Sequence, residues 1–188
     1  MTNANIDWGD YTYDQPWVGV DLHKLPRREA RQLYNARMTA IKDRLIQLEK
    51  LLKANSVDVN DIEAVTRWII DNVTPDETTR NEFRCEPELK WVSVTDDFGL
   101  YLGERCIQAL EGSVEWVLRT QHKKDISYHR AVLAGPGFKA SNKNFTADFT
   151  YLAYLMALRS LPGGKLPDGG ELLRAFEQAV SVLKTEAG

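Results

Sequence analysis

The sequence predicts a helix-rich α+β fold, with a single globular domain over residues 23–188 and a small antiparallel β-hairpin or sheet. Residues 1–22 are predicted to form an acidic, aromatic tail. Three observations lead to this prediction. Apolar residues recur at helical spacing over 91–110, two runs over 114–120 and 127–134 are strand-like, and a length of 188 residues suits one domain.

The tail holds four aspartates and no lysine or arginine, and it carries four aromatic rings, Trp8, Tyr11, Tyr13 and Trp17. Disordered segments are poor in aromatic residues. We therefore expect the rings, Trp17 above all, to bind the domain or a second copy of the chain. The alternative is a frayed terminus. The nearest basic groups that its acids could face are Arg27, Arg28 and Arg31.

Pro26 predicts the start of a long helix that ends near Asn55. Its apolar residues recur at steps of four and three, which indicates a helix packed on its own domain or, alternatively, a dimer interface. They are Tyr34, Met38, Ile41, Leu45, Leu48 and Leu52. Asn60 is predicted to cap a second helix, which ends at Thr74 before a polar loop over 74–88.

The helix predicted over 91–110 is apolar on two sides, which is typical of a helix buried between layers. We expect Phe98, Tyr101, Leu102 and Ile107 to lie in the core. The two strand-like runs follow, joined by residues 121–126. After a polar loop from Gly135 to Asn144, helices are predicted over 146–160 and from Leu172 onward, with a glycine-rich linker between them.

Composition and residue spacing disfavour several classes of protein. Hydrophobic residues at 43% and charged residues at 27% favour neither a disordered nor a membrane protein. No apolar run reaches the roughly 20 residues of a membrane span, and no signal-peptide pattern opens the chain, so a cytoplasmic location is predicted. Two cysteines and three histidines show no metal-site spacing, and no metal or cofactor is assigned. A pI near 5.7 disfavours nucleic-acid binding.

Two sets of residues suggest chemistry. Asp125, Ser127 and His129 would share one strand face, but a catalytic triad needs the histidine in the middle, and here the serine is. Asp97 and Glu104 lie on one polar stripe of the buried helix, roughly 10 Å apart along its axis. We favour a structural role for this stripe, with Glu104 paired to a base of the long helix or to Arg130.

Four segments carry a resemblance to known sequences: Trp91-x-Ser-Val, the run from Asp96 to Glu104 that ends in Leu-Gly-Glu, Val114-Glu-Trp116, and the run from Lys123 to Arg130. Together they resemble a group of uncharacterised bacterial proteins in which a helix ending in Leu-Gly-Glu leads into a strand that bears a tryptophan. The resemblance covers roughly residues 25–140. It implies a shared fold and no particular activity.

The sequence favours a non-enzymatic binding, adaptor or neutralising protein that acts on another protein, or one that self-associates. Its candidate binding residues are Trp17, Lys123, Lys124, Tyr128 and Arg130. The alternative is a small hydrolase or transferase that uses Asp97 or Glu104 with His129. A third interpretation is an RNA-binding module that uses Lys123, Lys124 and Arg130.

Overall fold

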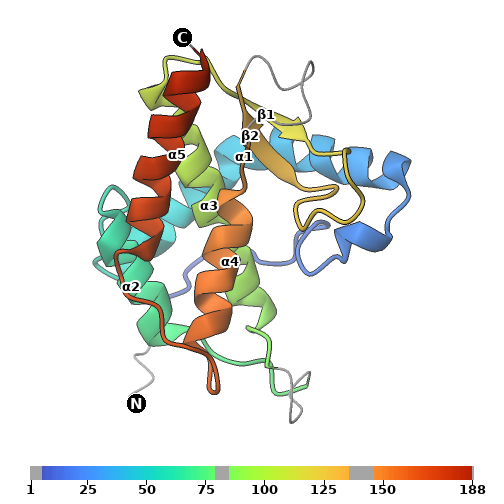
Figure 1. The fold of residues 1–188 in the computed structure, drawn as a ribbon. Coiled ribbons are helices and arrows are strands. Elements are labelled where there is room, and N and C mark those ends of the chain that lie inside the picture. The colour runs from blue at the N-terminus through green and yellow to red at the C-terminus, as the bar shows by residue number, and fades with distance from the viewer. Residues whose placement is uncertain (1–5, 79–84, 136–145, 188) are drawn as a thin grey trace.

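Helices make up most of the chain, and three short strands form one small sheet. The computed structural model describes residues 6–78, 85–135 and 146–187. Within these residues the helix-rich α+β class is confirmed (Figure 1). The elements, in chain order, are the 3-10 turn Leu22–Lys24, α1 (Arg27–Ala54), α2 (Ile62–Asn72), α3 (Leu89–Ala109), β1 (Glu115–Leu118), β2 (Ala131–Ala134), β3 (Thr146–Ala147), α4 (Phe149–Ser160) and α5 (Glu171–Ala187).

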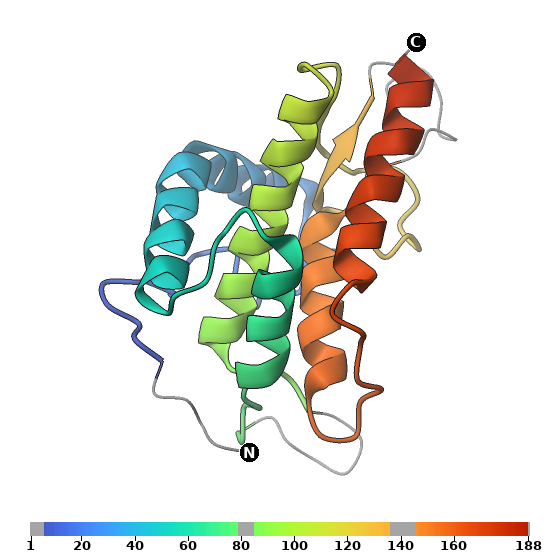
Figure 2. The same cartoon turned by 90° about the vertical axis from the view of Figure 1, so that its left-hand side faces the viewer.

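α3 is the central helix. It contacts α1, α4 and α5, and in Figure 2 it stands beside α2, α4 and α5, with α1 on its other side. Phe98 and Leu102 are fully buried, as predicted. Tyr101 and Ile107 are only half-buried at the edge of the core. The reason is that this side of α3 reaches the surface, where the Tyr101 hydroxyl bonds to Asn60 Oδ1 at 3.1 Å.

Two glycines let neighbouring elements approach α3 closely. A Cβ at Gly99 would lie 2.3 Å from Thr150 Cα in α4, and a Cβ at Gly103 would lie 2.0 Å from Cζ2 of Trp116 in β1. Both distances are too short for any side chain, so only glycine permits these contacts. The glycines four residues apart in α3 therefore fix where α4 and the sheet pack.

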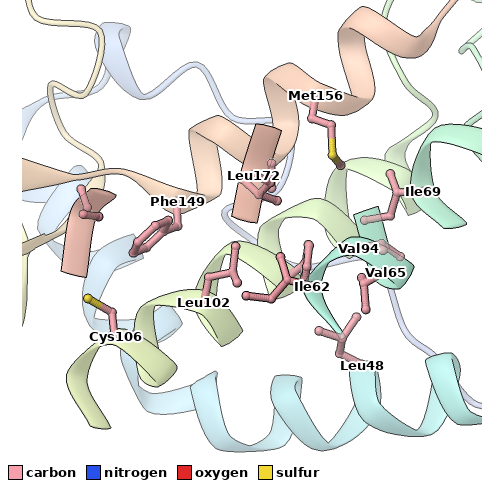
Figure 3. Packing of buried hydrophobic residues seen from close by; sticks show 14 of the residues in the cluster. Leu48, Ile62, Val65, Ile69, Val94, Leu102, Cys106, Phe149, Met156 and Leu172 are labelled. Atoms are coloured by element: carbon pink, nitrogen blue, oxygen red, sulfur yellow. The ribbon is translucent and has the colours of Figure 1, made fainter. Parts of the chain in front are cut away.

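The hydrophobic core is built from the facing sides of all five helices. Figure 3 shows Leu48 of α1, Ile69 of α2, Val94 of α3, Met156 of α4 and Leu172 of α5 in one cluster. Each of these side chains is buried, so the core runs continuously from one side of α3 to the other.

α1 packs on its own domain through its second half. Leu48 and Leu52 are fully buried, whereas Tyr34 and Met38 of its first half are half-buried. Arg37 and Arg44 are the buried side chains at the middle of the helix. The apolar seam predicted from the sequence is therefore interrupted by two arginines that point inward.

The sheet is antiparallel and has the strand order β1-β2-β3. Trp116 is paired with Leu133 between β1 and β2, which confirms the predicted hairpin. The prediction that the second strand begins at Ser127 is wrong, because β2 begins at Ala131. β3, which pairs Ala147 with Leu133, was not predicted. Of the loop predicted from Gly135 to Asn144, residues 136–144 lie outside the described residues.

Side-chain caps set the start of two helices. Asp61, rather than the predicted Asn60, caps α2, with its carboxylate accepting a hydrogen bond from the Ala64 amide. Asp148 caps α4 in the same way through the Tyr151 amide, so this helix begins three residues later than predicted. Pro75 and Pro87 form an isolated bridge that closes the loop predicted over 74–88, of which 79–84 lie outside the described residues.

The described part of the tail lies against α1 and α3. Tyr11 and Trp17 are buried and Trp8 packs against the core, which confirms for these three rings that they bind the domain, and they do so within one chain. Tyr13, which was predicted to bind with them, is 47% exposed. The expected partners are wrong. Arg27, Arg28 and Arg31 are exposed, and the tail instead bonds to carboxylates of α3. Ring burial, rather than attraction to the start of α1, holds the tail in place.

Candidate functional site

A cleft of about 430 Å³ lies between the end of the tail, α3, α4 and the loop before β2. Its lining combines aromatic rings with groups of both charges. Among the lining residues are Trp17, Arg37, Asp96, Ile126, Arg130 and Tyr151. These come from five parts of the chain, so the site exists only in the folded protein. A cleft of this size suits a small molecule or one or two side chains of a partner.

The two arginines of the cleft are paired with carboxylates. Arg37 of α1 forms an ion pair with Asp96 of α3, whose second oxygen accepts a hydrogen bond from Trp17 Nε1 at 3.1 Å. Arg130 Nε lies 2.7 Å from Asp148 Oδ2, and the Arg130 guanidinium lies 5.1 Å from the centre of the Tyr151 ring. Both charges of each pair are therefore largely satisfied within the chain.

A third ion pair, between Arg44 and Asp97, lies deeper, beneath the tail. Arg44 donates to both oxygens of Asp97, at 3.0 and 2.6 Å, and Tyr11 Oη donates to Asp97 Oδ2 at 2.5 Å. Arg44 Nη2 also donates to Ser93 Oγ at 3.2 Å. The side chains of Arg44 and Asp97 are only 2% and 1% exposed. This network joins the tail, α1 and α3 and is closed to solvent.

The ionisation of the network reflects its burial. Burial raises the pKa of Asp97 to about 6, although the Arg44 guanidinium and the Tyr11 hydroxyl both lower it. Burial, together with the nearby Asp97 charge, also raises the pKa of Tyr11 well above its ordinary value. A carboxyl group with a pKa near neutrality can serve as an acid or base. Here, however, Tyr11 and Arg44 occupy its oxygens.

The three catalytic candidates have separate partners. Asp97 belongs to the network with Arg44, and Glu104 Oε1 accepts a hydrogen bond from Trp116 Nε1 at 2.8 Å. His129 Nδ1 lies 3.2 Å from the carbonyl oxygen of Leu22. Glu104 was expected to pair with a base, so its indole partner is a correction. The structure does not bring a carboxylate of α3 into hydrogen-bond contact with His129.

The predicted strand face of Asp125, Ser127 and His129 is wrong. These residues lie in turns, where the Tyr128 and Arg130 amides bond to carbonyls three residues earlier. Asp125 Oδ2 pairs with Arg119 Nη2 at 2.6 Å, and its other oxygen accepts from the Ser127 amide. His129 has a positive φ of 65°, which a strand does not permit. The three side chains therefore do not share one face.

The candidate binding residues of this loop differ in exposure. Lys123 and Lys124 are exposed at its tip, and Ile126 between them and the cleft is 55% exposed. Tyr128 is buried, with its ring stacked on His129 at 3.8 Å between centroids. Its ring face toward His129 is thus covered. Of the three residues of the RNA-binding interpretation, Arg130 is paired within the chain, with Asp148.

Sequence reasoning missed Tyr11, Arg37, Arg44 and Ile126 as site residues. Arg37 and Arg44 are seven residues apart, two helical turns, and therefore lie on one face of α1. Two arginines at that spacing, on the same side of the helix as the apolar Leu48, were the signal in the sequence that these charges face inward. Ile126 alternates with polar neighbours, as an inward-facing strand residue would, and so gave no sign of its exposure.

Two further observations concern possible metal ligands and the thiol of Cys106. Among residues 6–78, 85–135 and 146–187, no group of three or more His, Cys, Asp or Glu side chains could hold a metal ion. Cys106 is buried in α3, and burial raises the pKa of its thiol to about 11. A thiol with such a pKa stays protonated near neutral pH and is a poor nucleophile.

Comparisons with protein-family models, curated proteins and solved structures found no match. In the part of the chain that the structure describes, none of the helices combines the length and the apolar character needed to span a bilayer.

Proposed function

We propose that this chain is a non-enzymatic protein that binds another protein through its β1–β2 loop, residues 119–130, and the adjoining cleft. The observation that carries the proposal is the position of Ile126. Its side chain is 55% exposed and lines the cleft, and two exposed lysines precede it in the same loop. Exposure alone does not distinguish Ile126 from other surface apolar residues, but its place at the rim of a cleft, with charged groups nearby in the chain, matches the mixed apolar and polar composition of protein interfaces.

The loop is held in one conformation by contacts at both ends and in its middle. The Arg119 amide donates to the Arg130 carbonyl at 3.0 Å, and the His129 amide donates to the Arg119 carbonyl at 2.7 Å. The carbonyl of Ile126 lies 3.1 Å from His23 Nε2, next to the docked tail. A loop ordered in advance loses less conformational entropy on binding, which favours recognition.

The exposed groups of the loop and the cleft indicate the charge and the apolar character expected of the partner's surface. Lys123 and Lys124 favour an acidic surface, because opposite charges speed encounter and set orientation. Ile126 and the Tyr151 ring at the cleft favour an apolar or aromatic side chain that enters beside them. The expected partner is therefore an acidic protein surface with one protruding apolar residue. Binding at such a surface would regulate or neutralise that protein.

The hydrolase or transferase interpretation is less well supported by the same geometry. It requires Asp97 or Glu104 to act together with His129, and each of these three has its own partner within the chain. The cleft carboxylate Asp96 is also engaged, by Arg37 and by the indole of Trp17. These contacts favour binding over catalysis.

The test compares two isoleucines of similar exposure. A partner captured from the native lysate is purified, and its Kd is measured for the wild type, Ile126→Asp, Ile46→Asp and the double variant Lys123→Glu/Lys124→Glu. Ile46 on α1 is 50% exposed and serves as the matched control. We expect Ile126→Asp to weaken binding by about tenfold or more, as a central interface residue does. Ile46→Asp should bind like the wild type.

The charge variant should slow association and reduce its dependence on salt. Equal affinity of the wild type and Ile126→Asp, with both folded by circular dichroism, would refute the proposal. Capture of RNA alone, or formation only of a homo-oligomer, would also refute it in favour of another class of partner.

A further inference from the structure

A smaller cavity, of about 20 Å³, adjoins the cleft and lies between the tail, α1 and the start of β2. Trp17 and Leu22 of the tail, Tyr34 and Arg37 of α1, and His129 are among its lining residues. Two buried side-chain atoms of this lining, Arg37 Nε and His129 Nε2, have no hydrogen-bond partner among the described residues. Arg37 is 5% exposed and His129 is 3% exposed.

The contact of His129 with the tail determines which ring nitrogen carries the hydrogen. His129 Nδ1 lies 3.2 Å from the carbonyl oxygen of Leu22. A carbonyl oxygen only accepts hydrogen bonds, so Nδ1 must be the donor. In the neutral ring Nε2 then has a free lone pair and is an acceptor. Arg37 Nε always carries a hydrogen and is a donor. The two unpartnered atoms are therefore complementary.

The size of the cavity limits what can satisfy both atoms. A buried water needs roughly 10–15 Å³ and two to four polar partners. A cavity of about 20 Å³ meets the first condition for one water molecule. Buried polar groups are almost always hydrogen-bonded, and apolar cavities are the ones that stay dry.

We propose that this cavity binds one water molecule, which accepts a hydrogen bond from Arg37 Nε and donates one to His129 Nε2. The water joins α1 to the turn before β2, and His129 in turn holds the Leu22 carbonyl of the tail. It is compatible with the Nδ1–H tautomer of His129 that the Leu22 carbonyl requires. The water is thus a structural component of the tail's attachment.

The test uses the full wild-type chain, so it does not depend on a variant that fails to fold. Nitrogen-15 NMR spectra at neutral pH report the hydrogen on each ring nitrogen of His129. His122, which is exposed, provides an internal reference for a ring in solvent. A high-resolution crystal structure reports the content of the cavity. We expect a protonated Nδ1, an unprotonated Nε2, and one solvent peak within hydrogen-bond distance of both atoms.

Three results would overturn the proposal. The first is the opposite tautomer of His129, with the hydrogen on Nε2. The second is a cavity without a solvent peak while the rest of the buried solvent is well defined. The third is an anion in the cavity, which would be recognised by an anomalous signal after chloride is replaced with bromide.

Discussion

Arg44 of α1 and Asp97 of α3 form an ion pair that is almost completely buried, with 2.6 Å between Arg44 Nη2 and Asp97 Oδ2. The pair joins helices whose sequences lie 53 residues apart. Tyr11 covers it, with the Arg44 guanidinium 4.9 Å from the centre of its ring. The Tyr11 hydroxyl completes the hydrogen bonds of the carboxylate. The pair therefore helps to bind the tail through Tyr11, and Tyr11 in turn shields the pair from solvent.

Removing one member of the pair should be costly, because the other charge stays buried. We expect Arg44→Met or Asp97→Leu alone to lower the free energy of unfolding by about 3–5 kcal/mol at neutral pH. The double variant should lose much less than the sum of the two, since it leaves no unpaired charge. Urea unfolding of the four proteins measures this. Additive losses would contradict direct coupling of the two residues.

The same carboxyl group predicts a particular pH dependence. Burial raises the pKa of Asp97 to about 6 in the folded chain, whereas an unfolded aspartate titrates near about 3.9. Between these values the folded state binds the proton more tightly. The contribution of Asp97 to the free energy of unfolding therefore falls as pH rises from about 4 to about 6, and it is constant above that range.

Comparison with Asp97→Asn isolates this effect. Aspartates near the surface whose pKa is lowered make stability rise with pH, but they are present in both proteins, so their contribution cancels in the difference. These are Asp21, Asp58, Asp125 and Asp168. The stability of the wild type minus that of the variant, from urea unfolding at each pH, should decrease between about pH 4 and pH 6. An increase over that window would mean that the ion pair lowers the pKa of Asp97 and that burial does not dominate.

The fold was largely predictable because its helices carry regular apolar spacing. α1 and α3 begin and end close to the predicted residues, and the β1–β2 pairing follows from two apolar runs. The turns over 125–130 were not predictable in this way. Ile126 and Tyr128 alternate with polar residues as in a strand, and alternation carries no information about the positive φ of His129.

The candidate site was less predictable, because its contacts join distant segments. Arg37 and Arg44 look like ordinary surface charges of a helix until their carboxylate partners in α3 are known. Ring burial of Trp17 followed from its unusual place in an acidic tail, but its bond to Asp96 did not. Local patterns predict which residues are apolar or charged, and long-range pairing decides what those residues contact.

The close approach of Trp116 to α3 should make Gly103 sensitive to any substitution. Gly103→Ala would place a methyl group 2.0 Å from Cζ2 of Trp116, so the ring and β1 must shift. We expect a loss of about 1–3 kcal/mol, as for other overpacked sites. Gly135→Ala is the matched control, because a Cβ at Gly135 would have no heavy atom of the described residues within 4 Å. Urea unfolding at one pH compares the two; equal losses would rule out the clash as the cause.

Docking of the tail should depend on Trp17 more than on the tail's charges. Trp17 is 9% exposed, and truncation of a buried tryptophan to alanine costs about 3–5 kcal/mol. Trp17→Ala should therefore lower the Tm clearly, whereas Asp14→Asn and Tyr13→Ala, at exposed positions, should not. Hydrogen exchange of residues 6–24 should rise only in Trp17→Ala. Unchanged exchange there would show that the ring does not hold the tail.

The most direct test of the proposed protein-binding function is photo-crosslinking from the β1–β2 loop. A photo-reactive amino acid replaces Ile126 in one protein and Ile46 in another, and each full chain is irradiated in the native lysate and studied by mass spectrometry. Both positions are exposed to a similar extent. The proposed function predicts one abundant adduct with a different protein from position 126 and none from position 46. Equal adducts from both positions, or adducts from position 46 alone, would contradict it.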